Sequence, residues 1–493
     1  MGSLESFSWK KFAGFAASFV FALLLALMLI MAAGSQPAGA ATAAYSAYSI
    51  TGTGGDCAVP GNGWGAWDAY TSTCTLQADI AVYGANGINI NSGNVTLNGN
   101  GHLLSGNNAA NTNGVYLSGM NGVTIKNLTV EHFYHGIELA SSGSNTLTGD
   151  NASSNNSSGI YLTGSSNNIL SDNTANSNSG GSNSGNAAGI ELESGSNGNT
   201  LSGNTANNTN GGNWMTSMYV AGIWIGSSGS NSLTNNTVIN NQGSNLSWFD
   251  VAGIYLNSSS NNILSGNTAS IPGYNGFGES IGLWLTSSAN GNTLFGNTSS
   301  SNQFGIYLNS CSNNQVYHNS FLNNSTVPAR VYGGSGNLFN LPAPTGGNYW
   351  SNWSTPDANS DGFVDSPYVF TGGQDNLPLT SPPASGKPPL TLDLPSPSWA
   401  SLSDYQAGVL SVTWMVNNTG AAEAWSVQLT GSSNTNGVTA STALPVYIGS
   451  GDILPGASGS VTLKYSVPAG VSAWISTLAG SAEDGLGTGY SYP

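Results

Sequence analysis

The sequence predicts an all-β protein, with a single-stranded right-handed parallel β-helix followed by a small C-terminal β-sandwich. The phrase SGIYLTGSSNNILSDNT (158–174) returns in near-copies that begin at Ala252 and Phe304. In the shortest repeats, the glycine at the second position of the phrase recurs after 22 or 23 residues. A short repeat of about this length, built from strands with period-2 alternation, is typical of a parallel β-helix. After Pro388, longer alternating segments separated by Gly and Asn turns favour a sandwich.

Each repeat carries two anchors, and the spacing between them locates the inserted residues. The first is a glycine before alternating apolar residues: Gly114, Gly136, Gly159, Gly189, Gly222, Gly253, Gly282 and Gly305. The second is a polar residue: Asn127, Asp150, Asn173, Asn204, Asn236, Asn267, Asn297 and Asn319. From the first to the second is always 13 to 15 residues, whereas the return varies from 8 to 18. The added length therefore enters at one corner, and the repeated Asn positions predict side-chain ladders.

The N-terminal segment predicts export. Lys10 and Lys11 precede an apolar run, and Ala38-Gly39-Ala40 offers a small-residue cleavage site, so residues 1–41 are expected to be a signal peptide or a membrane anchor. An extracytoplasmic location, secreted or at the cell surface, follows in either case. Residues 42–80 are expected to form an N-terminal cap in which Cys57 and Cys74 close a disulfide loop.

The charge balance excludes one class of partner. Lys and Arg number 6 against 22 Asp and Glu, which gives a formal net charge of −16. Nucleic-acid binding needs clustered cations, so we expect no nucleic-acid partner. Membrane contact is expected only through an uncleaved N-terminal segment.

The β-helix is expected over residues 81–345 and a C-terminal cap over 346–380. This cap contains DANSDGFVD, which places oxygen ligands at alternate positions and Gly362 at the sixth. That pattern matches the first nine positions of an EF-hand-like loop. The predicted calcium ligands are Asp357, Asn359, Asp361, the Phe363 carbonyl and Asp365, and the calcium is expected to be structural. Tyr368 stands where a full EF-hand has its Glu, and the alternative is an Asx-turn loop without metal. A linker at 381–389 then leads to the sandwich at 390–493.

Motifs at both ends of the β-helix resemble a known family. They are CTLQADI (74–80) with VTLNGNGHLLSG (95–106) at the start, and GGNYWSNW (346–353), DANSDGFVDSPYVF (357–370) and DNLPL at the end. They resemble right-handed β-helix proteins of the carbohydrate-binding and sugar-hydrolysis class, specifically the periplasmic copper-binding, NosD-type branch. The resemblance covers Cys74 to Leu379. The segment after it resembles the immunoglobulin-like modules appended to secreted proteins.

Copper is implied by the resemblance, but the residues do not favour it. His132 and His135 precede Gly136, and Met215 and Met218 precede Gly222. Imidazole and thioether groups are reasonable copper ligands. The two pairs are three coils apart, roughly 14 Å, which is too far for one site. Copper binding is therefore the less favoured reading.

One outward-facing position on the Gly-Ile-x-Leu strands carries the main functional prediction. It is occupied by Tyr116, Glu138, Tyr161, Glu191, Trp224, Tyr255, Trp284 and Tyr307, and the corner insertions add Trp214 and Trp248. Sugar rings stack on such aromatic platforms, so the partner is expected to be carbohydrate or another surface polymer. The alternative is that the aromatic rings stack on one another or are covered by the loops.

The carboxylates support a second reading, a glycoside-cleaving enzyme. Glu191 and Glu193 are about 6.6 Å apart along one strand, and Glu138 lies roughly 10 Å away along the stack. These separations overlap the range of paired glycosidase carboxylates. A hydrolase is favoured over a lyase, because only Lys126 and Arg330 are available in the helix to neutralise an acidic substrate. A structural envelope or adhesion protein without catalysis is the third reading; binding without catalysis is preferred.

Overall fold

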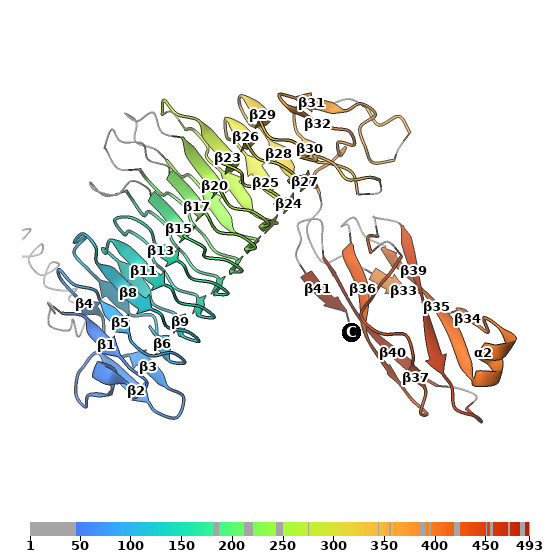
Figure 1. The fold of residues 1–493 in the computed structure, drawn as a ribbon, viewed down its shortest axis with the longest axis horizontal. Coiled ribbons are helices and arrows are strands. Elements are labelled where there is room, and N and C mark those ends of the chain that lie inside the picture. The colour runs from blue at the N-terminus through green and yellow to red at the C-terminus, as the bar shows by residue number, and fades with distance from the viewer. Residues whose placement is uncertain are drawn as a thin grey trace, which may run out of the picture.

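The computed structural model is almost entirely β-structure and contains the predicted right-handed parallel β-helix (Figure 1). It describes residues 46–492 except 181–186, 212–219, 243–249, 275, 344, 354–355, 360, 384–389, 394–395, 419–423, 450, 454–456, 472–473 and 484–488. The predicted signal segment and most of the linker therefore lie outside the described residues. Within the described residues, no helix is both long and apolar enough to cross a membrane.

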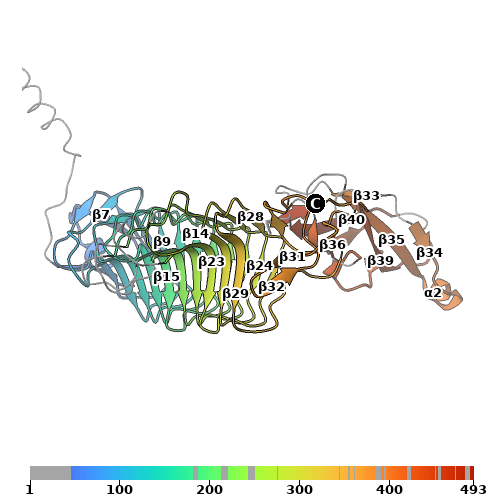
Figure 2. The same cartoon turned by 90° about the horizontal axis from the view of Figure 1, so that it is seen from above.

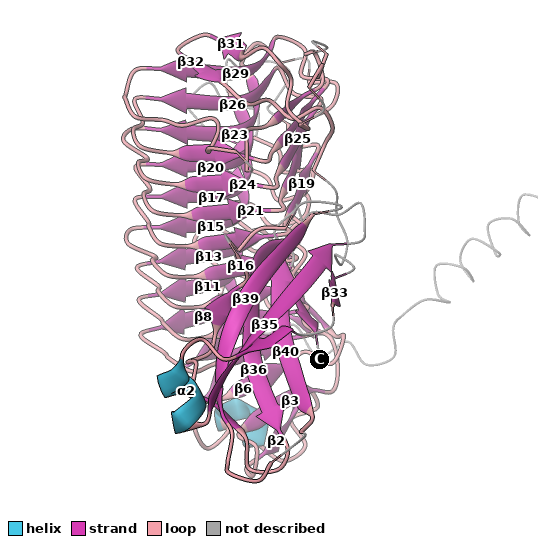
Figure 3. Cartoon of the chain, turned by 90° about the vertical axis from the view of Figure 1, so that its right-hand side faces the viewer, coloured by secondary structure: helices cyan, strands magenta, loops and turns pink. Residues whose placement is uncertain are grey.

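The first sheet of the β-helix has 11 strands, one from each coil, stacked like rungs in Figure 3. In order they are β1 (Tyr48–Ile50), β5 (Ile88–Ile90), β8 (Asn113–Ser118), β11 (His135–Ala140), β13 (Ile160–Thr163), β15 (Ala187–Glu193), β17 (Val220–Gly226), β20 (Val251–Asn257), β23 (Ser280–Thr286), β26 (Phe304–Asn309) and β29 (Val327–Tyr332). All of their pairings are parallel, as a β-helix requires.

The second sheet also has 11 strands, most of them three residues long. They are β2 (Gly65–Asp68), β3 (Thr73–Leu76), β6 (Thr96–Asn98), β9 (Thr124–Lys126), β12 (Thr146–Thr148), β14 (Ile169–Ser171), β16 (Thr200–Ser202), β18 (Ser232–Thr234), β21 (Ile263–Ser265), β24 (Thr293–Phe295) and β27 (Gln315–Tyr317). Strand β2 pairs antiparallel with β3 at the N-terminal end, next to the 3-10 helix η1 (Gly55–Ala58). A disulfide joins Cys57 to Cys74 there.

The third face of the β-helix is less regular. It consists of β4 (Ile80–Ala81), β7 (Leu103–Ser105) and β10 (Thr129–Glu131), and of β19 (Thr237–Ile239), β22 (Thr268–Ser270), β25 (Thr298–Ser300), β28 (Ser320–Leu322) and β30 (Tyr349–Trp350). Single parallel bridges, such as Asn151 with Thr174, connect the two groups. Seen from above in Figure 2, the coils follow one another along a single axis.

Inward side chains fill the interior of every coil. In β13, Ile160 and Leu162 are fully buried, and their counterparts in neighbouring strands are buried in the same way. The Cβ of a larger residue at the anchor glycine Gly222 would meet Val238 at 2.0 Å, so only glycine fits this corner. The repeated Gly-Ile-x-Leu pattern therefore reflects a close backbone approach and an apolar core.

Asparagine ladders hold the turns together, as predicted. In each column the backbone N–H of one residue donates to a side-chain oxygen of the residue one coil later. One column contains Asn145, Asn168, Asn199, Asn231, Asn262, Asn292, Asn314 and Asn337. Another contains Asp150, Asn173, Asn204, Asn236, Asn267, Asn297, Asn319, Asn348 and Asp375.

Asn127 is not part of that second column, contrary to the expectation from sequence. The Asp150 side chain accepts the N–H of Leu128, so Leu128 occupies the equivalent place one coil earlier. Asn127 precedes it with a φ of 52°, a left-handed turn position that Asn tolerates. The sequence Asn127-Leu128-Thr129 resembles the Asn-Thr anchor of the other coils, but here the column position is occupied by the residue after the Asn.

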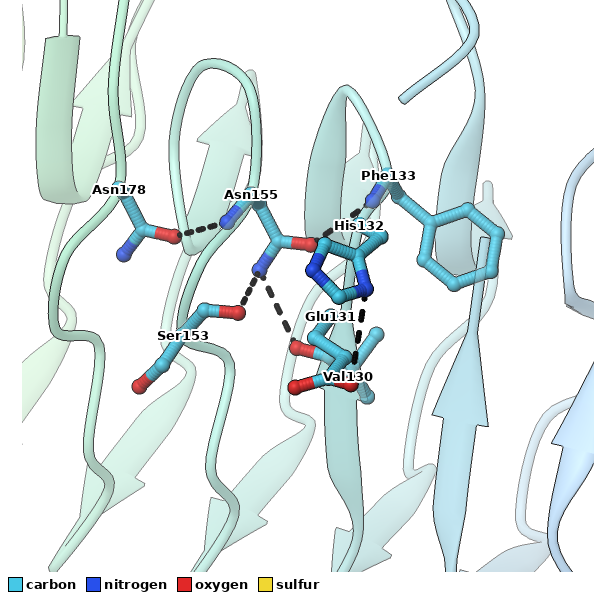
Figure 4. Close-up of polar contacts among 7 residues, drawn as sticks. All are labelled: Val130, Glu131, His132, Phe133, Ser153, Asn155 and Asn178. Carbon is cyan, nitrogen blue, oxygen red and sulfur yellow. Dashed lines mark hydrogen bonds and ion pairs between the residues drawn. The ribbon is translucent and has the colours of Figure 1, made fainter. Parts of the chain in front are cut away.

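A third, shorter column is shown in Figure 4. Asn155 donates its N–H to Asn178 and accepts the N–H of Phe133, while its side-chain amide donates to the carbonyls of Val130 and Ser153. These bonds satisfy buried backbone groups in turns that lack a regular sheet ladder.

The C-terminal cap closes the β-helix around one carboxylate. Asp375 accepts hydrogen bonds from the backbone N–H of Asn348 at 2.7 Å and from the Trp350 indole at 2.9 Å. Trp350 also stacks on Phe321 of the last coil and on Tyr368. Tyr368 and Asp375 lie opposite each other on the short antiparallel pair β31 (Tyr368–Phe370) and β32 (Gly373–Asp375).

The C-terminal domain consists of two antiparallel sheets that share one apolar core. One sheet contains β33 (Leu390–Leu392), β34 (Ser396–Ser398), β35 (Val409–Asn418), β37 (Thr439–Ala440) and β39 (Ser458–Ser466). The other contains β36 (Trp425–Asn434), β38 (Val446–Tyr447), β40 (Ser476–Glu483) and β41 (Gly489–Tyr492). The helix α2 (Leu402–Ala407) lies between β34 and β35.

Candidate functional site

The predicted outward residues form one continuous ladder across the first sheet. Neighbouring strands pair them in the order Tyr116, Glu138, Tyr161, Glu191, Trp224, Tyr255, Trp284, Tyr307 and Arg330. Arg330 in β29 extends the series by one coil. The register predicted from sequence is therefore correct, and the ladder divides into two halves with different surroundings.

The second half of the ladder is not the exposed platform expected from sequence. Trp224, Tyr255 and Trp284 are only 5%, 2% and 5% exposed. Tyr255 stacks on Trp284 with ring centroids 4.4 Å apart, and Trp224 lies 5.8 Å from Tyr255. The three rings form a buried cluster, so for them the structure bears out the alternative considered from the sequence, that the aromatic rings stack on one another or are covered.

The physical reason for this burial lies in a second column on the same outer surface. The residue before each anchor glycine packs against these rings: Ala188, Ala221, Ala252, Ile281 and Phe304. The three alanines in this column leave room for the large rings. The larger apolar residues Ile281 and Phe304 occupy the same column in the next two coils. Among the remaining predicted ligands, Tyr307 is half-buried, whereas Trp214 and Trp248 lie outside the described residues.

The first half of the ladder is polar and partly accessible. We define the polar half as the ladder residues Tyr116, Glu138, Tyr161 and Glu191, from strands β8, β11, β13 and β15, together with Glu193, which lies two residues after Glu191 on β15. All except Glu191 are half-buried. Three of the five carry carboxylates, so the structure brings the predicted catalytic candidates together with two predicted ligand residues.

Glu191 is the buried member of the polar half. Its carboxylate accepts a hydrogen bond from the Ser158 hydroxyl. Burial raises the pKa of Glu191 well above its ordinary value, and repulsion from the neighbouring Glu193 raises it further. Glu191 therefore holds a proton at a pH where an exposed glutamate would be ionised.

Glu193 and Glu138 are the accessible carboxylates. Glu193 accepts a hydrogen bond from the Tyr161 hydroxyl at 3.3 Å. Burial raises the pKa of Glu138, and a hydrogen bond from the Asn113 side chain partly opposes this effect. A sugar hydroxyl can donate to either carboxylate, because ionised carboxylates act only as acceptors.

Two further residues belong to this site, and the sequence argument did not assign them to it. His135 stacks on Tyr161 with ring centroids 4.5 Å apart, and the backbone N–H of Ser158 points to its Nδ1 atom at 3.4 Å. Burial lowers the pKa of His135 to about 4, so the imidazole is neutral. The sequence does contain a feature that could have identified them: His135 and Ser158 directly precede anchor glycines, at a position where the next three coils have Ala.

The geometry around the histidines does not assemble the copper ligands considered above. His135 is buried against Tyr161, whereas His132 is exposed and lies beside Glu131, with 3.5 Å between Nδ1 and a carboxylate oxygen (Figure 4). Met215 and Met218 lie outside the described residues. In the described part of the chain, no group of three or more His, Cys, Asp or Glu side chains is arranged to hold a metal ion.

The predicted calcium loop has the hydrogen-bond pattern of a chain of Asx turns. Asp357 accepts the backbone N–H groups of Asp361 and Gly362, and Asp361 accepts that of Phe363. Asp365 accepts the N–H of Ala358, which closes the loop. Carboxylate oxygens retain further lone pairs after such bonds, so this arrangement is compatible with a hard cation.

A second charged group lies beyond the buried rings. The Arg330 guanidinium lies 5.0 Å from the Tyr307 ring centre and 3.6 Å from a Glu279 carboxylate oxygen. Asp250 accepts the backbone N–H of Glu279 at 2.8 Å. Burial raises the pKa of both acids, and for Glu279 the nearby Arg330 opposes the shift. Arg330 is thus held by an aromatic ring and a partly buried carboxylate.

Comparisons with solved structures find matches at low similarity. The Dettilon tailspike protein (gp208) is 14% identical, with 85% of this chain and 86% of that chain covered, at a TM-score of 0.35. An alginate lyase from Paenibacillus sp. str. FPU-7 is 15% identical, with 62% and 98% covered, at 0.32. Pectate lyase Pel9A is 14% identical, with 65% and 83% covered, at 0.31. A likeness this distant does not extend to function.

Family models agree with the fold. A search of curated proteins finds no match to this chain. Residues 64–244 match the right handed beta helix region, and residues 205–355 match the periplasmic copper-binding protein (NosD) family. The second match includes the final coils and the GGNYWSNW motif that closes them. The chain is therefore a right-handed parallel β-helix protein, and its residues 205–355 are similar to the NosD family.

Proposed function

We propose that this protein is a secreted or cell-surface β-helix protein that binds a carbohydrate polymer across the polar half of the ladder. One observation carries the proposal: Glu138, Tyr161 and Glu193 lie on three consecutive strands, half-buried and in one outer surface. Two carboxylates and a phenol on neighbouring strands, whose backbones are about 4.8 Å apart, offer hydrogen-bonding groups along an extended chain of sugars.

In this site, hydrogen bonding is the main mode of recognition, and stacking on an aromatic platform is not. One face of Tyr161 is covered by His135, so its hydroxyl and remaining surface are the parts available to a ligand. Tyr116 extends the accessible surface by one more aromatic side chain. The two accessible carboxylates of the polar half, Glu138 and Glu193, would repel an anionic ligand, which favours a neutral, hydroxyl-rich polymer.

A second candidate function, glycoside cleavage, is favoured by the protonation of Glu191. A carboxylic acid that keeps its proton near neutral pH is what a general acid needs, and glycosidases pair it with a second carboxylate. Glu193 lies on the same strand and is the neighbour that raises the Glu191 pKa. Glu191 would then protonate the leaving oxygen, and Glu193 would act as base or nucleophile.

Two measurements separate these functions. Binding is tested on a glycan array with the mature protein, the Tyr161→Ala variant and a matched control, Tyr317→Ala. Tyr317 is also half-buried on an outer surface, but in β27 of the second sheet. Cleavage is tested by release of reducing sugar from each bound glycan, with Glu191→Gln against Glu279→Gln. Binding without release supports the first function, and release lost only in Glu191→Gln supports the second.

We further propose that the loop at Asp357–Asp365 binds a structural calcium ion. The support is its close agreement with the first nine EF-hand positions and the φ of +89° at Gly362, which suits the required turn. Calcium would neutralise three carboxylates beside the cap. Its expected effect is a higher melting temperature, lost on addition of EGTA in the native protein but not in Asp361→Ala.

A further inference from the structure

The β-sandwich carries an exposed apolar tip far from the polar half in sequence. We define the tip as Trp399, Leu402 and Tyr405, on and just before α2. Their side chains are 45%, 72% and 59% exposed. Figure 1 shows α2 at one end of the sandwich. Isolated exposed apolar residues are normal, but three together within seven residues are unusual and mark an interaction surface.

The tip is held in a defined conformation. Strand β34 pairs antiparallel with β35 immediately before the tip, with Ser398 opposite Ser411. The Ser401 hydroxyl caps α2 by accepting the N–H of Asp404 at 3.1 Å. Gly408 ends the helix with a φ of 67° and returns the chain to β35. A preorganised surface loses little conformational entropy when it binds.

The two aromatic rings form a corner. Trp399 and Tyr405 meet edge to face, with centroids 5.2 Å apart and planes at 89°. One ring can therefore support the C–H face of a sugar while the other stands beside it as a wall. Residues next to this corner in the sequence have exposed side chains that donate and accept hydrogen bonds: Ser398, Ser401, Ser403 and Gln406.

The charge of the domain selects among possible partners. Residues 390–493 contain six Asp and Glu but only one lysine, Lys464. An anionic membrane surface attracts clusters of Lys and Arg, and none is present in this part of the sequence. Asp404 and the surrounding serines would also have to be dehydrated if the tip entered a bilayer. A neutral polysaccharide imposes neither cost.

We propose that the tip is a second, independent carbohydrate-binding site that takes a sugar unit of a neutral polysaccharide. It does not rest on the function proposed for the β-helix, because it uses different residues in a different domain. If both sites bind the same polymer, they act together, since the second binding event then occurs at a high effective concentration.

The test is sedimentation of the full mature protein with insoluble cellulose, chitin and β-1,3-glucan, and with phosphatidylcholine vesicles. The variant is Trp399→Ala combined with Tyr405→Ala, and the matched control is Tyr447→Ala, which removes a 57% exposed tyrosine elsewhere in the sandwich. We expect affinity for at least one polysaccharide to fall more than about tenfold in the double variant and to remain in the control.

The remaining outcomes overturn the proposal. They are equal polysaccharide binding by the native protein and the double variant, no polysaccharide binding by the native protein, and tip-dependent binding to the vesicles alone. Tyr161→Ala is included as a separate arm. If Tyr161→Ala loses polysaccharide binding and the tip variant keeps it, the β-helix site is supported and the tip is rejected. If the tip variant loses polysaccharide binding and Tyr161→Ala keeps it, only the β-helix site is rejected. The melting temperature of each variant confirms folding, since exposed substitutions have little effect on stability.

Discussion

The Tyr161 hydroxyl donates a hydrogen bond to Glu193 from the neighbouring strand, at 3.3 Å. This bond joins the aromatic and acidic parts of the polar half into one surface. His135 supports the ring from the side of β11, and Glu191 lies beneath the same surface with its bond to Ser158. The predictions below follow from this arrangement and from the ladders that hold the coils together.

Replacing Tyr161 by Phe separates the two roles of its side chain. The ring and its contact with His135 are kept, while the bond to Glu193 and a hydroxyl oxygen that can accept from the ligand are lost. Because the hydroxyl is lost in Tyr161→Phe and the whole side chain in Tyr161→Ala, we expect affinity for the bound glycan to fall roughly 2- to 10-fold in Tyr161→Phe and further in Tyr161→Ala. Isothermal titration with the best ligand from the array measures both. Equal affinities in the native protein and Tyr161→Phe would show that the hydroxyl has no part in recognition.

Glu191 makes the stability of the protein depend on pH. Its pKa is raised by folding, so the folded state favours the protonated form. This contribution is fully present below the unfolded pKa, about 4.5, and is lost as pH rises through the raised folded pKa. We expect Glu191→Gln, which mimics the protonated acid, to melt at the same temperature as the native protein at pH 4 and at a higher temperature at pH 9. A constant difference across this range would contradict the raised pKa.

Asp150 has a similar effect at the start of an Asn column. One of its oxygens accepts the N–H of Leu128, and burial raises its pKa to about 7. An asparagine here would supply a donor where the next residue in the column, Asn173, donates to the Leu147 carbonyl. We therefore expect Asp150→Asn to stabilise the protein above pH 7 by on the order of 2 kcal/mol.

The same substitution should have a much smaller effect at pH 4, where Asp150 is protonated in the folded state and roughly half protonated in the unfolded state. Asp172→Asn is the matched control, because Asp172 is exposed in a nearby turn. Chemical denaturation at pH 4 and pH 8 gives the change in the free energy of unfolding for each of the two variants at each pH. Stabilisation of the same size at both pH values, or in the control, would count against this explanation.

An Asn in the middle of a column is expected to be essential for the stack. The Asn267 side chain accepts the N–H of Asn236 and donates to the Leu233 carbonyl, all in buried positions. Asn267→Ala leaves both backbone groups without partners, and we expect a loss of about 3 kcal/mol or more in the free energy of unfolding. The control is Asn261→Gly, an exposed turn position with a φ of 59° that glycine adopts readily. Similar losses in both variants would show that the ladder bonds are not what stabilises the turns.

Much of the fold could be predicted because aligning the repeats in the sequence also gives the register in which their strands pair. Once the anchor glycines are aligned, the pairing of Tyr161 with Glu191 and of Trp224 with Tyr255 follows from the period of the strands alone. The Asn columns follow in the same way, since a buried turn amide needs a partner in each coil. The shift at Asn127 shows the limit, because its local spelling matches the anchor although the backbone places it one residue earlier.

Exposure could not be predicted from alternation. An outward direction on a strand says which face a side chain occupies, and not what covers that face. Trp284 is buried because Phe304 and Ile281, in another column, lie on the same outer surface. Likewise, Ser158 and His135 join the site from that column, which the two-residue period of the strand does not indicate. Both results depend on packing between coils, which local sequence patterns do not specify.

The most direct test of the central claim is the affinity of the native protein, Glu138→Gln, Tyr161→Ala and Tyr317→Ala for the best ligand of a glycan array. The account predicts that the native protein and Tyr317→Ala bind a neutral polymer equally. It also predicts that Glu138→Gln and Tyr161→Ala each lose more than about tenfold in affinity while keeping the native melting temperature. Unchanged binding in both polar-half variants, or no glycan binding by the native protein, would contradict it.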